Sequence, residues 1–147
     1  MLTDIFGNRI IWTALIAWAT AQILKVLLTL GIQHTFDRSR FLGAGGMPSS
    51  HSACVCAMAT VVGLREGFGS SIFAVALLFA VVVMYDAAGV RRESGKNAEV
   101  INHIVESLSS NGWELEEEPL KELIGHTPFQ VAAGALLGVI IGCIAAL

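Results

Sequence analysis

Four long apolar segments dominate the pattern of hydrophobic and polar positions along the chain. They cover residues 10–32, 48–64, 68–88 and 128–147. The second is the weakest of the four, because it is short and begins with polar residues. Segments of this length approach or exceed the roughly 30 Å hydrocarbon core of a bilayer when they are helical. The pattern therefore predicts an all-α, polytopic membrane bundle of about four transmembrane helices.

A polar stretch, residues 89–127, separates the third segment from the fourth. Part of it has apolar residues at helical spacing, namely Ala98, Ile101, Ile104, Val105 and Leu108. The intervening face carries Glu99, His103 and Glu106. This spacing predicts an amphipathic helix that lies along the membrane or caps the bundle. Pro119 is expected to open a further short helix, and residues 1–147 are expected to form one integral membrane domain.

Composition supports the membrane assignment. The chain is 54% hydrophobic and only 14% charged, whereas soluble domains carry about 25% charged residues. The net charge of −3 argues against a nucleic-acid partner. The three cysteines lie in apolar stretches without the spacing of a disulfide framework or a zinc site. We therefore expect no metal and no cofactor.

The distribution of basic residues predicts an orientation. Four spans place both termini on one side of the membrane and the loops 33–47 and 89–127 on the other. Those two loops carry Arg38, Arg40, Arg91, Arg92, Lys96 and Lys121. The opposite side has only Arg9 and Arg65. By the positive-inside rule the two loops face the cytoplasm, although an anion-binding site would also gather arginines there.

Small residues in the segments predict close helix packing. Gly134, Gly138 and Gly142 form a doubled G-x-x-x-G pattern, which lets two helix backbones approach closely. The helix 128–147 is therefore also a candidate contact between copies of the chain. In the first segment, Lys25 is expected either to face the bundle interior or to extend to the membrane surface.

Polar residues within or beside the apolar segments fall at one end of the predicted bundle. They are Lys25, His51, Asp86, Arg91, Arg92 and His126. Helix N-termini offer unpaired N–H groups and a partial positive charge, and arginine offers a planar fork for phosphate oxygens. Two such N-termini together with these side chains predict an anion site.

Two helix starts contribute to that site. Gly-Gly-Met-Pro-Ser-Ser-His, ending at His51, is a glycine-rich approach in which Pro48 is expected in the first helical turn. The stretch from His126 to Gln130 fits a capping box, with Thr127 as N-cap and Gln130 at the third helical position.

Three blocks in this order resemble a known family. Gly-Gly-Met-Pro-Ser-Ser-His-Ser-Ala, Tyr-Asp-Ala-Ala-Gly-Val-Arg-Arg and Gly-His-Thr-Pro-x-x-Val-x-x-Gly are similar to the divergent branch of the type-2 phosphatidic acid phosphatase superfamily. That superfamily also contains the vanadium-dependent haloperoxidases. The resemblance extends over roughly residues 20–140.

The resemblance implies roles for individual residues. His126 is implied as the nucleophile that forms a phosphohistidine, and His51 as the general acid for the leaving group. Phosphate contacts are implied for Ser49, Ser50, Lys25 and either Arg91 or Arg92. The family's Lys-x6-Arg-Pro block is not met after Lys25, so Arg38 or Arg40 is the candidate for its guanidinium.

The most important departure from the family pattern is Gln130, which stands where the family has an acidic residue four positions after the nucleophilic histidine. Replacing such a carboxylate by an amide in a serine protease triad costs about 10⁴ in rate. Gln130 can orient the histidine without supplying charge. Asp86 is the alternative acid, unless it only pairs with a neighbouring arginine.

Two functions follow. The first is a metal-independent membrane phosphohydrolase, resembling an acid phosphatase, that acts on lipid phosphates or pyrophosphates. The alternative is a non-catalytic protein that binds anionic headgroups or transports lipids with the same site. Each candidate residue has a purely structural alternative. His51 would pack one helix on another, His126 would only precede a helix cap, and the arginines would only set the membrane topology. His34 and His103 lack motif support and are expected at the surface.

Overall fold

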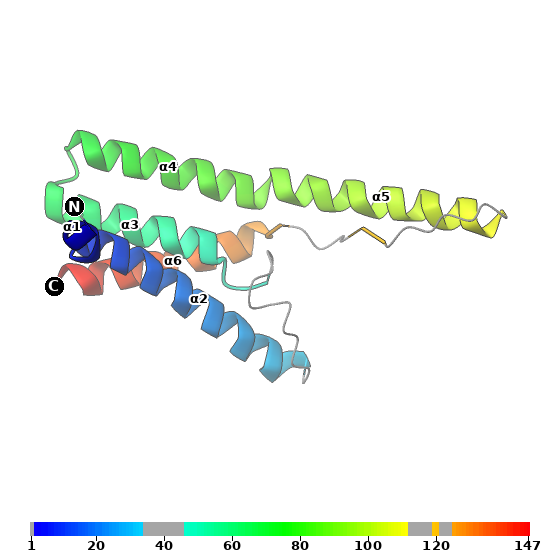
Figure 1. Cartoon of the computed structure of the whole chain (residues 1–147), viewed down its shortest axis with the longest axis horizontal. Coiled ribbons are helices and arrows are strands. Elements are labelled where there is room, and N and C mark those ends of the chain that lie inside the picture. The colour runs from blue at the N-terminus through cyan, green and yellow to red at the C-terminus, as the bar shows by residue number, and fades with distance from the viewer. Residues whose placement is uncertain (1, 34–45, 112–118, 121–124) are drawn as a thin grey trace.

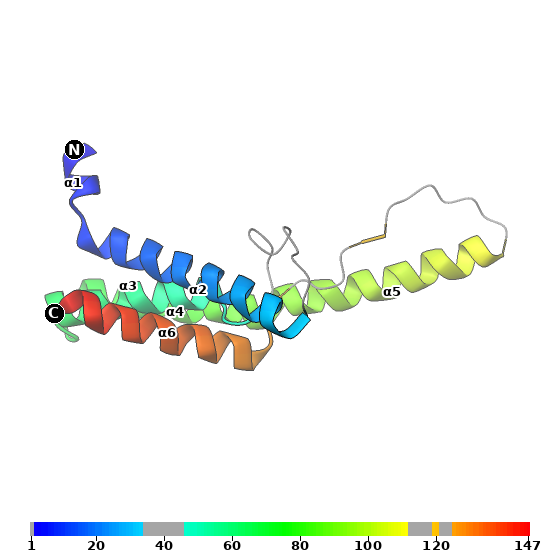
Figure 2. The same cartoon turned by 90° about the horizontal axis from the view of Figure 1, so that it is seen from below.

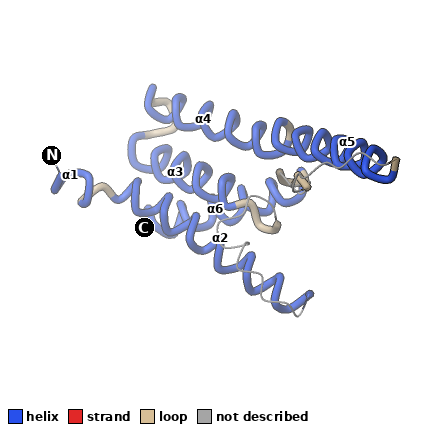
Figure 3. Tube along the Cα trace, turned by 45° about the vertical axis from the view of Figure 1, so that its right-hand side comes forward, coloured by secondary structure: helices blue, strands red, loops and turns tan. Residues whose placement is uncertain are grey.

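The chain folds into α-helices, as the sequence predicts (Figure 3). The computed structural model describes residues 2–33, 46–111, 119–120 and 125–147. Its helices are α1 (Leu2–Phe6), α2 (Arg9–Gln33), α3 (Ser50–Glu66), α4 (Ser71–Ala88), α5 (Val90–Ser110) and α6 (Pro128–Ala146). Within the described residues there is no β-strand. The expected all-α membrane bundle is confirmed.

Serine and threonine N-caps set the starts of three helices. Ser49 caps α3, Ser70 caps α4 and Thr127 caps α6, each accepting a hydrogen bond from a backbone N–H of the first turn. Two boundaries therefore begin later than expected, at residues 50 and 71 rather than 48 and 68. Pro48 precedes the N-cap of α3, so its expected place in the first turn was wrong.

Helix α3 lies at the centre of the bundle and packs against α2, α4 and α6. Its inward positions are small or β-branched, and Ala53, Ala57 and Val61 are fully buried. The large apolar side chains of α2, α4 and α6 instead point outward, as Leu78 and Leu136 do. Small residues between helices and large ones outside are typical of helix packing in lipid.

Among the residues that the structure describes, three helical stretches are long and apolar enough to cross a membrane. They are the span Arg9–Gly31 in α2, the continuous stretch Ser71–Ser110 of α4 and α5, and α6. Helix α3, with 17 residues and a more polar composition, is not among them. The chain is therefore an integral membrane protein whose central helix is shielded by apolar neighbours.

The glycines of α6 form the closest helix contact. A Cβ on Gly134 would clash with the backbone carbonyl oxygen of Ser49, the N-cap of α3, and a Cβ on Gly138 would clash with that of Ala53 in α3. A Cβ on Gly142 would meet Thr60 at 2.7 Å. The doubled G-x-x-x-G pattern thus packs against α3 of the same chain. A contact between copies through α6 would have to use the outward face of that helix.

We expect Gly138→Val to lower the free energy of unfolding by about 3 kcal/mol or more, the upper end of typical overpacking costs. The added side chain meets backbone atoms of Ala53, which cannot rotate away. Thermal unfolding in detergent measures the change, and Ala132→Val on the exposed side of α6 is the matched control. Equal stability of the two variants would contradict this packing.

Helix α5 continues the line of α4 and projects beyond the ends of the other helices (Figures 1 and 2). Gly89 separates the two helices. The expected amphipathic helix is therefore present, but in this structure it neither caps the bundle nor turns aside from α4. The expected short helix after Pro119 falls mostly on residues outside the described ranges, and Pro119 and Leu120 themselves are not helical.

One end of the bundle gathers the helix ends that the sequence singled out. The C-terminal ends of α2 and α4 and the N-terminal ends of α3 and α6 lie there, opposite the two chain termini (Figures 1 and 2). Backbone hydrogen bonds join them: Ser49 N–H donates to the Gln130 carbonyl at 3.0 Å, and His126 N–H donates to the Ala87 carbonyl at 3.0 Å. This end holds the candidate site.

Candidate active site at one end of the bundle

Two histidine rings meet at this end of the bundle. His51 is the second residue of α3, and His126 lies two residues before α6. Their ring centroids are 6.0 Å apart, with the ring planes at 66°. They are 75 positions apart in the sequence, so the packing of α3 on α6 brings them together.

Gln130 holds the His126 ring and caps α6 with the same oxygen. Its Oε1 accepts a hydrogen bond from the Thr127 N–H at 3.1 Å and lies 3.3 Å from His126 Nδ1. Its backbone N–H donates to Thr127 Oγ1 at 3.3 Å, which completes the capping box. An oxygen that is already an acceptor favours the tautomer with a proton on Nδ1. His126 Nε2 then carries the free lone pair.

The environment of His126 favours the neutral ring. The residue is only 1% exposed. Burial lowers the pKa of His126 below its ordinary value, and the charges of Lys25 and His51 lower it further, while the hydrogen bond to Gln130 and the backbone of Gly46 oppose this. Nε2 is buried and makes no hydrogen bond of standard geometry to the described part of the chain, although the backbone of Gly46 is near enough to influence the ring. A neutral ring with an available Nε2 is a potential nucleophile.

Lys25 faces the bundle interior. It is 1% exposed, and it is near enough to His126 to act on its charge. The alternative, a side chain that extends along the helix to the membrane surface, is wrong. Gln22, one turn earlier in α2, is also buried. Gln22 shares a helix face with Lys25 but was not among the residues expected at the site.

The two serines of the Pro-Ser-Ser-His block differ in their surroundings. Ser49 Oγ accepts hydrogen bonds from the Ser52 backbone N–H at 3.3 Å and the Ser52 hydroxyl at 3.0 Å, and Ser49 is fully buried. Its side chain therefore stabilises the start of α3. Ser50 is the first residue of that helix and is also buried. Its backbone N–H belongs to the unpaired first turn.

The two helix N-termini contribute unequally to an anion site. At α6, Pro128 has no N–H, and the capping box occupies the N–H groups of Thr127 and Gln130. At α3, the Ser49 side chain satisfies Ser52 N–H, and the N–H of Ser50, the first helical residue, has no acceptor within its own helix. The start of α3 is therefore the stronger anion-binding end.

Several predicted site residues are not placed by the structure. Arg38 and Arg40 lie outside the described residues, and so do the side chains of Arg91 and Arg92, whose backbone forms the first turn of α5. Asp86 is half-buried near the end of α4, next to the residue whose carbonyl binds His126. Across the described ranges, no three His, Cys, Asp or Glu side chains gather closely enough to hold a metal ion.

Comparison with known proteins shows the family of the chain. The family model described as "Divergent PAP2 family" matches residues 6–141. An uncharacterized membrane protein, YuiD of Bacillus subtilis (strain 168), is 39% identical over 148 residues, covering 94% of each chain. No solved structure matches. With its three blocks, its helical membrane fold and a family match over nearly its whole length, the chain belongs to the divergent PAP2 family.

Proposed function

We propose that the protein is a metal-independent membrane phosphohydrolase that acts on lipid phosphates or pyrophosphates. The observation that carries the proposal is the pairing of the half-buried His51 with the buried His126, with Gln130 on Nδ1 of His126 and Lys25 close by. Such a pair supplies a nucleophile and a proton donor, and the neighbouring cation and the N-terminus of α3 neutralise phosphate oxygens.

The proposed reaction has two steps. His126 Nε2 attacks phosphorus in line with the leaving oxygen, so that an N–P bond forms while the P–O bond breaks. His51 gives a proton to the leaving oxygen. Water then attacks the phosphohistidine, His51 accepts its proton, and the N–P bond breaks with its electron pair returning to Nε2. Two easier steps replace one difficult step.

We propose Lys25 and the start of α3 as the groups that hold the phosphoryl oxygens, together with Arg38 or Arg40 and Arg91 or Arg92 from the loops. The Ser50 backbone N–H contributes in the same way. Ser49 acts indirectly in this proposal, because its buried oxygen caps α3 and fixes the backbone of the donors. Asp86 is retained as the second candidate acid.

We further propose that α2, α3, α4 and α6 each cross the membrane and that the site opens toward the cytoplasm. The basic residues of the loops 33–47 and 89–127 support this orientation. A substrate whose phosphate lies at the membrane surface and whose tail lies in lipid would then reach the site from the bilayer. Phosphorylated lipids have this form.

Phosphate release by the purified full-length protein tests the proposal. We expect release from phosphatidic acid or a lipid pyrophosphate in the presence of EDTA, inhibition by vanadate, and loss of activity in both His51→Ala and His126→Ala. The Gln130 amide favours the alternative, a headgroup-binding or lipid-transport protein, because it supplies no charge. Headgroup binding that survives His126→Ala, without turnover by the native protein, would support that alternative.

The pH profile tests the state of His126. Its pKa is lowered, so the neutral nucleophile persists below the ordinary histidine pKa, and kcat/KM falls only as the pH drops through the lowered value. In Gln130→Glu the new carboxylate stabilises the protonated His126 ring and raises the pKa of His126. The acidic limb of the kcat/KM profile should therefore move to higher pH. Glutamate at this position keeps the capping box, so thermal stability should be unchanged. An unmoved acidic limb would show that His126 does not govern the profile.

A further inference from the structure

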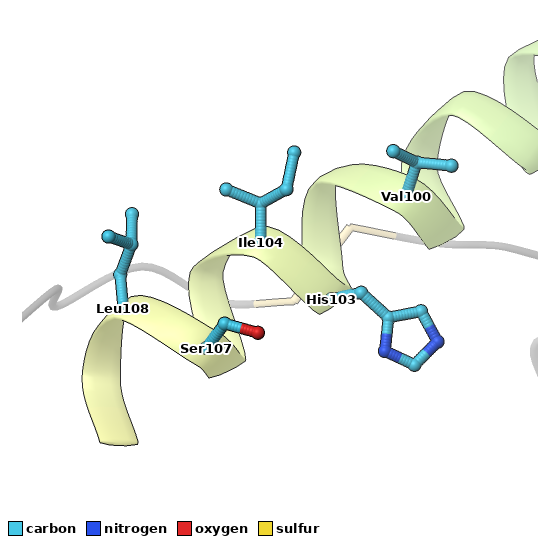
Figure 4. A pocket seen from close by; sticks show the side chains of 5 residues that line it. All are labelled: Val100, His103, Ile104, Ser107 and Leu108. Atoms are coloured by element: carbon cyan, nitrogen blue, oxygen red, sulfur yellow. The ribbon is translucent and has the colours of Figure 1, made fainter. Parts of the chain in front are cut away.

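One face of α5 exposes a row of large apolar side chains, here called the α5 stripe: Val100, Ile101, Ile104 and Leu108. Figure 4 shows Val100, Ile104 and Leu108 pointing to one side of the helix; together with the neighbouring His103 and Ser107 they line a shallow hollow. The polar side is highly exposed and carries the pair His103–Glu106. The stripe lies on the helix that projects beyond the bundle.

Another side of α5 is already occupied by the returning chain. The Asn102 side chain donates to the Leu120 carbonyl at 2.8 Å and accepts from the Leu120 N–H at 2.9 Å. Gly95 and Ala98, on adjacent parts of the helix surface, are buried. The α5 stripe remains exposed beside this contact.

The start of α5 lies at the expected boundary between lipid and water. Helix α4 has 18 residues, which at about 1.5 Å each match the thickness of the hydrocarbon core. Its last turn carries the exposed Tyr85, followed by Asp86. Tyrosine favours the membrane interface, and a carboxylate is costly inside the hydrocarbon core and therefore lies outside it. Helix α5 therefore begins at the level of the lipid headgroups.

We propose that the α5 stripe docks on the headgroup–acyl boundary of the membrane beside the histidine site, with α5 turning at Gly89. Ile101 and Leu108 lie three and four heptads after Ala80, which packs against α3. Residues one heptad apart are offset by about 20° around a straight helix. Ile101 and Leu108 therefore lie within about a quarter-turn of the side of the helix on which Ala80 faces the bundle. Val100 and Ile104 lie farther round the helix, so the stripe as a whole faces sideways from the bundle, and a bend of α5 to that side at Gly89 turns the stripe onto the membrane plane.

The pattern of α5 fits lipid better than a second copy of the chain. A two-helix seam through Ile101, Ile104 and Leu108 would continue, at the same spacing, through Asn97 and Ser94. Polar residues at these core positions weaken a coiled coil. Docking on lipid does not require the apolar residues to align with those of a partner helix. Amphipathic helices with a strongly polar face lie in the interface between membrane and water.

Spin-label accessibility tests this docking on the full-length protein in phosphatidylcholine–phosphatidylglycerol vesicles. The three native cysteines are replaced by alanine, and circular dichroism and gel filtration verify the fold of this background. Labels are placed in Ile104→Cys and Leu108→Cys, with His103→Cys and Glu106→Cys as matched controls on the polar side. Collision rates are measured with oxygen, which concentrates in lipid, and with a water-soluble nickel chelate.

We expect the ratio of oxygen to nickel collisions to be several-fold higher at 104 and 108 than at 103 and 106. Nickel access at all four positions would overturn the proposal, because α5 would then project into water. Low access of both reagents at 104 and 108 would overturn it as well, in favour of burial against a second copy or another part of the chain. These results do not depend on phosphatase activity.

Discussion

Replacing His126 with alanine is expected to reduce the rate of phosphate release from a lipid phosphate by about 10⁴-fold or more. The residue lies at the centre of the proposed chemistry, because its Nε2 is the atom that bonds to phosphorus. Without that atom no covalent intermediate forms, and the remaining positive groups can only bind the substrate. Initial rates with the purified variant in detergent, at saturating substrate, measure the loss.

A suitable control separates this loss from a folding defect. His126 is buried, and its backbone N–H bonds to Ala87 whatever the side chain, so the alanine variant should keep the bundle. His103→Ala removes an exposed histidine from α5 and should leave the rate unchanged. If His126→Ala folds like the native protein and retains more than a tenth of its rate, His126 is not the nucleophile.

His51→Gln is expected to reduce turnover of an alkyl phosphate by about 10²- to 10⁴-fold, the usual contribution of a general acid. The same variant should lose much less with an aryl phosphate such as p-nitrophenyl phosphate. A nitrophenolate leaves without protonation, so the proton from His51 matters little for that substrate. Parallel kcat/KM measurements with both substrates give the comparison, because kcat/KM reports the departure of the leaving group and not the later hydrolysis, in which His51 acts as base for both substrates.

The leaving-group dependence distinguishes a proton donor from a structural role. A histidine that only packs α3 against α6 would cost the same factor with both substrates when it is replaced. Equal losses for the alkyl and aryl phosphates would therefore contradict the assignment of His51 as general acid, even though the variant is inactive.

The sequence predicted most of the helical fold because the apolar segments are long and their caps are local. Thr127 and Gln130 form a capping box that involves only neighbouring residues, and it is present as expected. The start of α3 was misplaced because Pro48 and Ser49 both suit the beginning of a helix. Only the hydrogen bond from Ser52 N–H to Ser49 Oγ decides between them.

The meeting of His51 with His126 followed from topology, since antiparallel helices bring alternate ends together. Other features depended on tertiary packing that a single sequence does not encode locally. Gln130 orients His126 and caps α6 with the same oxygen, which the sequence pattern alone does not show. The glycines of α6 contact α3 within the chain, and a G-x-x-x-G pattern alone does not reveal which helix it meets.

The direction of α5 was also beyond sequence reasoning. Its amphipathic pattern predicts that one face needs an apolar partner, but the pattern does not say how the helix leaves α4. Only Gly89 separates the two helices, and the backbone remains helical enough for α5 to continue the same line. The partner of the α5 stripe is therefore a question for measurement in a bilayer.

Trapping the phosphorylated enzyme tests the central claim most directly. The native protein is mixed with a ³²P-labelled lipid phosphate, quenched with denaturant at alkaline pH, digested and analysed by mass spectrometry. The account predicts a phosphate that is stable to alkali and labile to acid, bonded to His126, and absent from His126→Ala. Rapid turnover without any such adduct, or label on a different residue, would contradict it.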